Sequence, residues 1–252
     1  MVEILILSLI QGVTEFLPVS SSSHLIIVAE YIKFEDRSLS IDVSLHIGSF
    51  LAVIVFFYKD ILKFFKNFNF FLKIFLSSIP VILVGFFLVK TNFIDELRKI
   101  EIIGWTTLIF GFLLFISDKF DLKNNIYDNF NIKSALIIGI FQIMSLIPGV
   151  SRSGITITAA RILKFKRFDA GKISFLLSIP TLGAVSIYGV SEIITNQDLN
   201  FSILNLFAVF FSFLFSIITI KYFLKYIQKF SFNIFVFYRL ILGVILLIIA
   251  YL

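Results

Sequence analysis

Two polar stretches decide the fold of this chain: Gln11-Gly-Val-Thr-Glu15-Phe-Leu-Pro18-Val-Ser20-Ser-Ser-Ser23-His24 and Pro148-Gly149-Val-Ser151-Arg152-Ser153-Gly154-Ile-Thr156. Each stretch interrupts an apolar run that would otherwise pass for a membrane helix. In hydrocarbon an unpaired backbone group is costly, so a broken helix is tolerated only inside protein or beside a water-filled cavity. Ionisable groups such as Glu15, His24 and Arg152 at membrane depth mark a functional site by default. The two stretches are therefore predicted to be the halves of one polar site.

The composition is that of an integral membrane protein. Of the 252 residues, 59% are hydrophobic and only 15% are charged, whereas about a quarter of a soluble domain is charged. The absence of cysteine excludes disulfides and thiolate metal sites. The net charge of +6 does not predict nucleic-acid binding, because Lys and Arg in cytoplasmic loops give membrane proteins the same excess. The N-terminus lacks the basic region and cleavage site of a signal peptide, so none is predicted.

Six stretches have about the 20 apolar residues that a membrane-spanning helix needs. They are 41–58, 70–89, 102–118, 172–193, 203–220 and 233–251. Two hairpins complete the chain, with half-helices at 2–17 and 25–32 and at 134–147 and 155–163. Proline breaks a helix interior and serine favours caps, which places the breaks at the polar stretches. The predicted fold is one all-α polytopic membrane domain, 1–252, with six full transmembrane helices and two re-entrant broken-helix hairpins.

The positions of Lys and Arg predict the orientation. With both termini outside and the hairpins entering from opposite faces, 15 Lys and Arg residues fall inside and 5 fall outside. The five outside are Lys33, Arg37, Lys90, Arg98 and Lys99. Such an excess on the inside is typical of membrane proteins.

An internal repeat is also predicted. A shift of 130 residues places Pro18 on Pro148 and Ser21 on Ser151, and three spans follow each hairpin. An odd number of spans between the hairpins inverts the second half, and broken helices at matching places are typical of inverted repeats with a site near the midplane. Residues 1–118 and 119–252 are the predicted first and second repeats. The alternative is two similar loops by chance.

The first polar stretch offers an acid, hydroxyls and an imidazole. Gln11 and Glu15 share one helix face, and their oxygens would suit Mg²⁺ or Ca²⁺; the alternative is a structural carboxylate bonded to backbone N–H groups. The serines begin a half-helix, where an anion is favoured, although they could also serve as caps. His24 can act as acid, base or nucleophile, or it could be a packed core residue. His46 is assigned a structural role, and Arg239 is expected to snorkel to the interface or to pack, with no functional role.

The second polar stretch offers an anion grip. Its Arg152 can hold phosphate bidentately, and Ser151, Ser153 and Thr156 add hydroxyls. No Walker loop is present, so ATP is not predicted. An anion clamp, an acidic cation site and an acid–base histidine together indicate phosphoryl transfer. A substrate that reaches the site from lipid would be a prenyl or acyl phosphate.

These motifs resemble the undecaprenyl-diphosphate phosphatase family of the bacitracin-resistance type, over most of the chain. The resemblance implies hydrolysis of undecaprenyl diphosphate to undecaprenyl phosphate and inorganic phosphate. That reaction recycles the lipid carrier for peptidoglycan synthesis at the bacterial plasma (inner) membrane, and it uses a divalent cation. The residues carried over are Gln11 and Glu15 for the metal and diphosphate, Ser21, His24, Glu15 and Arg152 for catalysis, and Ser151, Ser153 and Thr156 with Arg152 for phosphate. Gln11 stands where some members have Glu, and His46 where Gln is common.

Several alternatives stay open. The nucleophile could be Ser21, His24 or water. The main rival function is a lipid-phosphate transporter or flippase, since inverted repeats with broken helices are a common transporter design. A second membrane phosphatase type pairs an Arg motif with two histidines, but no histidine follows Arg152. A purely structural scaffold would have no reason to bury these charges. The oligomeric state is open, with a homodimer as one alternative.

Overall fold

Six long apolar helices form the body of the protein. The computed structural model describes residues 1–32, 38–66, 68–91, 96–195 and 202–252. The helices long and apolar enough to cross a membrane are α3 (Leu39–Phe56), α5 (Phe68–Lys90), α7 (Ile100–Asp118), α11 (Arg167–Thr195), α12 (Ile203–Ile227) and α13 (Asn233–Tyr251). Each covers one predicted span, so the prediction of an all-α multi-pass membrane protein with six spans is confirmed. Lys33 and Arg37, assigned to the outside, lie beyond the described residues.

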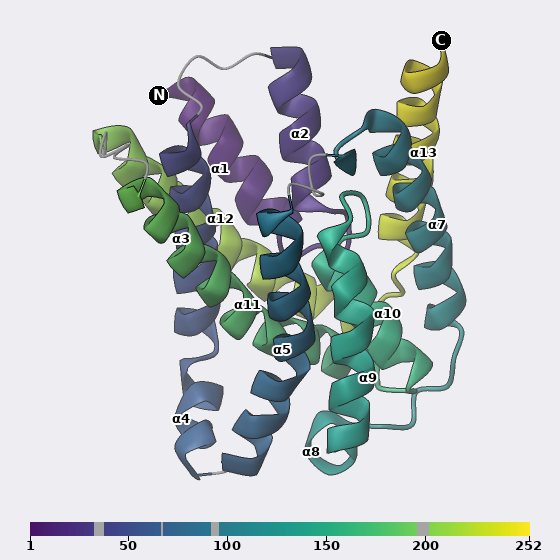
Figure 1. Ribbon diagram of the computed structural model, residues 1–252. Helices are drawn as coiled ribbons and strands as arrows, with labels where there is room; N and C mark the ends of the chain where they lie inside the picture. The colour runs from purple at the N-terminus through teal and green to yellow at the C-terminus, as the bar shows by residue number, and fades with distance from the viewer. Residues whose placement is uncertain (33–37, 67, 92–95, 196–201) are drawn as a thin grey trace.

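Four shorter helices form two hairpins (Figure 1). The first pairs α1 (Val2–Thr14) with α2 (Ser21–Ile32), and the second pairs α9 (Ile132–Ile143), extended by the 3-10 turn η1 (Met144–Leu146), with α10 (Arg152–Ile162). We call residues 15–20 the first break and residues 147–151 the second break. The hairpins extend inward from opposite ends of the bundle, and their breaks meet in its middle. Whether they re-enter a bilayer stays a prediction.

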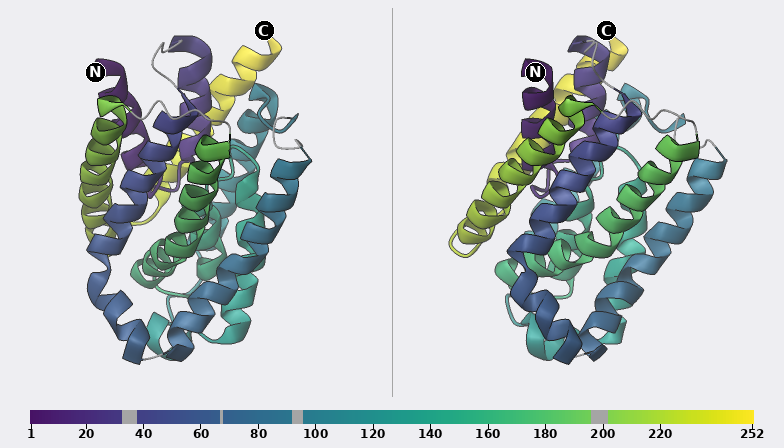
Figure 2. Two further views of the ribbon diagram at one scale, coloured as in Figure 1. Left: turned by 60° about the vertical axis from the view of Figure 1, so that its left-hand side comes forward. Right: turned by 90° about the vertical axis from the view of Figure 1, so that its left-hand side faces the viewer.

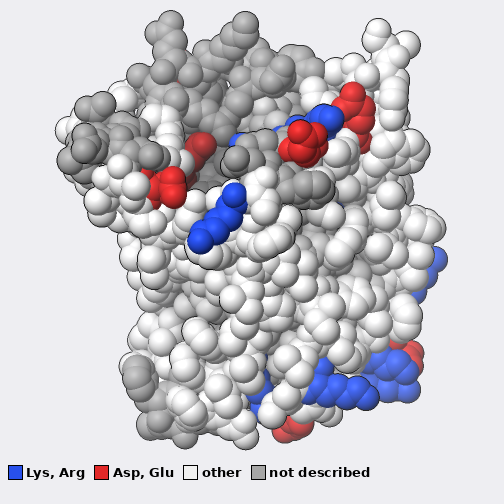
Figure 3. All heavy atoms as spheres, viewed as in Figure 1, with Lys and Arg blue, Asp and Glu red and all other residues white. Residues whose placement is uncertain are grey.

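Both termini lie at one end of the bundle, as Figures 1 and 2 show. We call it the outer end, following the predicted orientation, and the opposite end the inner end. The short helices α4 (Tyr58–Lys66) and α8 (Ile126–Asn129) lie at the inner end. On the face drawn in Figure 3, most charged side chains gather toward the two ends, and the band between them is largely uncharged apart from a basic group at its right-hand edge.

Local sequence signals fix where several helices begin. The Asn131 side chain accepts from the backbone N–H of Ser134, and the Ser134 side chain reciprocates, which makes a capping box at the start of α9. A second capping box begins α12, between Ser202 and Asn205. Ser38 caps α3 by accepting from the N–H of Ile41. These caps satisfy N–H groups that the first turn of a helix leaves unpaired.

The descending helix of each hairpin packs on a span of the other half of the chain. Helix α1 lies against α12, and α9 lies against α5. A glycine permits each close approach: a Cβ on Gly12 would lie 2.7 Å from Cβ of Phe215, and one on Gly139 would lie 2.4 Å from the Ser77 carbonyl oxygen. Each descending helix thus packs across the boundary between the two predicted repeats. The division at residues 118 and 119 itself stays a prediction.

Candidate active site

The two breaks share one backbone device. Ser20 and Ser151 have φ of 76° and 69°, a conformation uncommon outside glycine, and each directly precedes a return helix. The backbone therefore pairs Ser20 with Ser151, a shift of 131 rather than the 130 inferred from sequence. Between its proline and its positive-φ serine the second break has one residue more than the first. Gly149, with φ of 94°, lies in this part of the second break. The structural counterpart of Arg152 is consequently Ser21.

Glu15 is the centre of the polar site. It follows the last residue of α1 and is only 7% exposed. One carboxylate oxygen, Oε2, accepts from Ser21 Oγ at 2.8 Å and from Gln11 Nε2 at 3.1 Å. The other, Oε1, accepts from Arg152 Nη2 at 3.1 Å. Ser21 and Arg152, the first residues of the two return helices, thus each donate to a different oxygen of the same carboxylate.

Arg152 joins the breaks and keeps one donor free. Its Nη1 donates to the Ser174 carbonyl at 3.1 Å, and its Nη2 also lies 3.4 Å from the Glu15 carbonyl. Its Nε is buried and has no hydrogen-bond partner. A buried donor without an acceptor is costly and needs an explanation. A phosphate oxygen is an acceptor that would pair with it.

His46, to which the sequence assigns a structural role, belongs to the polar network around Glu15. Its Nδ1 lies 3.1 Å from Gln11 Nε2. Gln11 Nε2 also donates to Glu15, so both contacts of the amide are made by its nitrogen. The amide oxygen Oε1 is buried and has no hydrogen-bond partner. The sequence gave no signal for this contact, because His46 lies 35 residues from Gln11.

The donor set fits a hard cation in part. Gln11 Oε1 is an unpaired buried oxygen beside the Glu15 carboxylate, and such ligands suit Mg²⁺ or Ca²⁺. Among the described residues no group of three or more His, Cys, Asp and Glu is placed to hold a metal. A cation here would therefore take its remaining oxygens from a diphosphate or from water.

The hydroxyls of the second polar stretch are engaged within the protein. Ser151 Oγ caps α10 by accepting from the Gly154 N–H at 3.1 Å. Ser153 Oγ donates to the Leu17 carbonyl in the first break at 2.7 Å. Thr156 Oγ1 donates to the Arg152 carbonyl and to Ser174 Oγ, both at 2.8 Å. In this geometry the three side chains hold the breaks and α10 in place, and their direct contact with phosphate stays a prediction.

His24 lies on the same face of α2 as Ser21, three residues earlier. Its Nδ1 donates to the Ser20 carbonyl at 2.6 Å, which leaves Nε2 to accept from the hydroxyl of Tyr238. The two rings stack with centroids 5.7 Å apart. Sequence reasoning missed Tyr238, because a single tyrosine in an apolar span carries no distinguishing pattern. His24 is thus held on both nitrogens at the edge of the site.

Arg239 does not extend to the membrane interface, and it does more than fill space among apolar side chains. The expectation from sequence that it has no functional contacts was wrong. It is fully buried and donates to carbonyl groups of both breaks. An arginine at membrane depth is itself a signal of function, so this residue could have been found from sequence.

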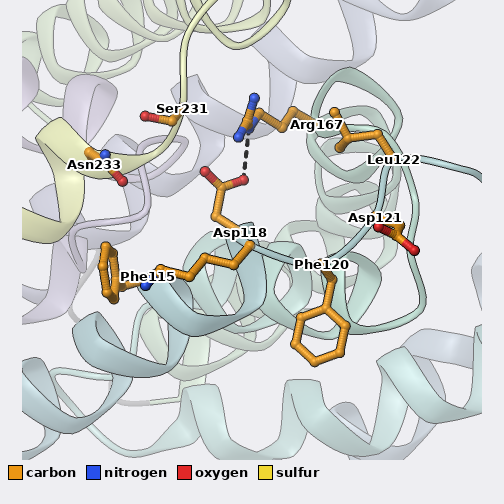
Figure 4. Close-up of a pocket in the computed structure, with 9 residues that line it drawn as sticks. Phe115, Asp118, Phe120, Asp121, Leu122, Arg167, Ser231 and Asn233 are labelled. Atoms are coloured by element: carbon orange, nitrogen blue, oxygen red, sulfur yellow. Dashed lines mark hydrogen bonds and ion pairs between the residues drawn. The ribbon is translucent and has the colours of Figure 1, made fainter.

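A separate cavity of about 590 Å³ lies at the inner end (Figure 4). It holds the ion pair between Arg167 Nε and Asp118 Oδ1, at 2.7 Å, and is also lined by Asp121. A hydrogen bond from Lys123 and its charge hold the pKa of the exposed Asp121 below its usual range. No candidate site residue lines this cavity, so it is distinct from the site at the breaks.

Fold and site together define a multi-pass membrane protein with a buried acid–base site between two broken helices. The family model for bacitracin resistance protein BacA matches residues 4–245. The chain is 47% identical to an undecaprenyl-diphosphatase of Pelagibacter ubique, over 99% of this chain and 98% of the relative. It is 39% identical to one from Jannaschia sp., over 98% and 97% of the two chains, and 40% identical to one from Saccharophagus degradans, over 94% and 93%. The chain belongs to the BacA family.

Proposed function

We propose that this protein hydrolyses undecaprenyl diphosphate to undecaprenyl phosphate and inorganic phosphate. The reaction returns the lipid carrier to cell-wall synthesis at the bacterial inner membrane and confers bacitracin resistance. Family membership and the name shared by the full-length relatives support the substrate. The observation that carries the proposal is the contact between Glu15 and Arg152, 137 residues apart, which joins the two breaks into one site.

The diphosphate is gripped by Arg152. Oxygens of the diphosphate pair with the free Nε of Arg152 and compete with the Glu15 carboxylate for Nη2. This is the bidentate geometry that arginine offers to phosphate. The start of α10, where Arg152 is the first residue, adds the favourable end of a helix dipole. Because the pair is buried, these charges act in a medium of low dielectric constant and stabilise developing negative charge strongly.

Glu15 is the base of the proposed reaction. Ser21 Oγ donates to its Oε2 at 2.8 Å, the arrangement of a hydroxyl beside the group that removes its proton. Either this hydroxyl or a water in its place attacks the terminal phosphorus. Its proton passes to Glu15 as the bond from that phosphorus to the oxygen of undecaprenyl phosphate breaks. With Ser21 as nucleophile, water then releases inorganic phosphate from the serine. His24, on the same face of α2, is the proposed acid for the leaving oxygen in its doubly protonated form: Nδ1–H stays on the Ser20 carbonyl, and the second proton, on Nε2, passes to the leaving oxygen in place of the contact with Tyr238.

A divalent cation is part of the proposal. Gln11 Oε1 and the Glu15 carboxylate would hold it, and the cation would neutralise charge on the diphosphate. His46 fixes the Gln11 amide so that this oxygen faces away from the imidazole.

The test is release of inorganic phosphate by the purified protein in detergent. We expect release from undecaprenyl diphosphate, its loss on addition of a chelator and its return with Mg²⁺ or Ca²⁺. Detergent micelles offer no second compartment, so a transporter or flippase would release nothing. A folded, cation-loaded protein that releases no phosphate would overturn the proposed function. Light scattering in the same detergent distinguishes a monomer from a homodimer, the alternative that the sequence leaves open.

A further inference from the structure

Arg239 connects the two breaks through its guanidinium group. Its Nη1 donates to the Pro18 carbonyl of the first break at 3.3 Å and to the Val150 carbonyl of the second at 3.0 Å. Its Nη2 donates to the Gly149 carbonyl at 2.8 Å, and its Nε donates to the Thr107 carbonyl of α7 at 3.2 Å. One side chain on α13 therefore ties both breaks to each other and to α7.

Three of the four carbonyls that Arg239 pairs lie in the breaks, outside the helices: those of Pro18, Gly149 and Val150. Within a bilayer such groups must be satisfied inside the protein. Side chains satisfy neighbouring carbonyls in the same way: Ser153 donates to Leu17 and Thr106 donates to Pro148. Arg239 differs because it alone of these donors reaches both breaks, and because its charge is buried among carbonyl groups.

Two glycines leave the space that this guanidinium fills. A Cβ on Gly154 would lie 2.9 Å from Nη1 of Arg239, and one on Gly111 would lie 3.0 Å from its Cβ. Gly154 stands in the first turn of α10, two residues after Arg152. The packing around Arg239 thus extends directly to the helix that presents Arg152 to Glu15.

We propose that Arg239 is a positioning residue for the phosphatase reaction, which holds the two breaks at the separation that lets Arg152 and Glu15 grip one diphosphate. The inference rests on the proposed function for its catalytic consequence, but not for its structural claim. Lysine at this position keeps the charge. It cannot reach four carbonyls in three segments, because only arginine presents a planar fork of donors.

Arg161 provides a matched control. It is also fully buried and also donates to carbonyl groups, those of Asp118, Phe120 and Phe165 at the inner end. It lies nine residues along α10 from Arg152, or about 13 Å at the helical rise per residue. R161K therefore makes the same change at a buried arginine outside the site, with the difference that Arg161 also pairs with the Asp118 carboxylate.

The separation of the breaks is measured directly by pulsed EPR. The chain has no cysteine, so S22C and M144C carry the only spin labels, one exposed position on each hairpin. R239K and R161K are compared with the arginine parent in this labelled background. Separately, kcat for phosphate release and the melting temperature are measured for both variants without labels.

We expect R239K to broaden the distance distribution and add a longer separation, while R161K leaves it unchanged. We expect both variants to lower the melting temperature, but only R239K to lower kcat, by about 100-fold, the cost of a displacement near 1 Å. An unchanged distribution in folded R239K overturns the inference, whatever the activity. Equal losses of kcat in the two variants also overturn it, because they indicate a merely structural role. Absence of phosphate release by the parent defeats the proposed function alone, since the distance measurement still decides the role of Arg239.

Discussion

The first and second breaks have the same backbone and opposite chemistry. Each ends in a serine with positive φ that precedes a return helix. The first break contains the carboxylate of Glu15, whereas the second is followed at once by the guanidinium of Arg152. The two groups meet at 3.1 Å. The two hairpins have similar backbones, but one supplies the negative charge and the other the positive charge. Together they form one asymmetric site, in which an anion and a cation can be held side by side.

The two sides of the site also differ in the charged groups that surround Glu15 and Arg152. On the acidic side, the described neighbours of Glu15 from the first half of the chain, Gln11, Ser21 and His46, are neutral or basic groups and supply no second carboxylate. The basic side has Arg239 behind it, which pairs only backbone carbonyls. We therefore expect substitutions of Glu15 to have the largest effect on the reaction.

E15Q tests the acidic side. It keeps the shape of the side chain but removes the charge and the proton acceptor, so kcat should fall by about 10³-fold, the upper range for a group that stabilises the transition state. Phosphate release and the melting temperature are measured together. The matched control is Q11E, which adds a carboxylate one turn away and should keep activity. Full activity of E15Q would remove Glu15 from the chemistry.

Substitution of Gln11 tests whether its amide oxygen binds the cation. Because Oε1 is buried and unpaired beside Glu15, Q11A should raise the Mg²⁺ or Ca²⁺ concentration for half-maximal activity by about 10-fold or more, the usual cost of weakening a metal site. Q11E should lower it. A titration of phosphate release against cation after chelation gives both values. Identical titrations for the three proteins would show that Gln11 is not a ligand.

Substitution of Ser151 tests the positive-φ conformation that the two breaks share. S151A loses the cap of α10 and leaves alanine at φ 69°, so the free energy of unfolding should fall by about 1–2 kcal/mol. S151G should be less destabilising, since glycine tolerates positive φ and is itself an acceptable cap. Thermal unfolding in detergent ranks the two variants. Equal losses in the two variants would mean that the hydroxyl, which both remove, rather than the backbone conformation dominates at this position.

Y238F is expected to have the smallest effect. It keeps the ring stacked on His24 and removes only the hydroxyl that donates to Nε2. The loss of one hydrogen bond, about 1 kcal/mol, would change kcat by about fivefold. Y222F, at an exposed tyrosine of α12, should leave kcat unchanged. A fall of several orders of magnitude in Y238F would give Tyr238 a direct part in the reaction.

Much of this molecule was predictable from sequence. Length and apolarity identified all six spans, and the proline and serine positions located both breaks to within a few residues. The exact register was not accessible, because the run of four serines fits shifts of 130 and 131 while the match of Pro18 with Pro148 favours 130, whereas the backbone pairs Ser20 with Ser151. The contacts of His46, Tyr238 and Arg239 were missed because each joins segments far apart in sequence, and only the packing of whole helices brings them together.

The central claim is that Arg152 and Glu15, from two broken helices, grip one diphosphate. R152A tests it most directly, by phosphate release from undecaprenyl diphosphate in detergent with cation present. The account predicts a fall of about 10³-fold in kcat/KM with the protein still folded, since most of the chain's core lies outside the breaks. Folded R152A that releases phosphate at the rate of the parent would contradict it.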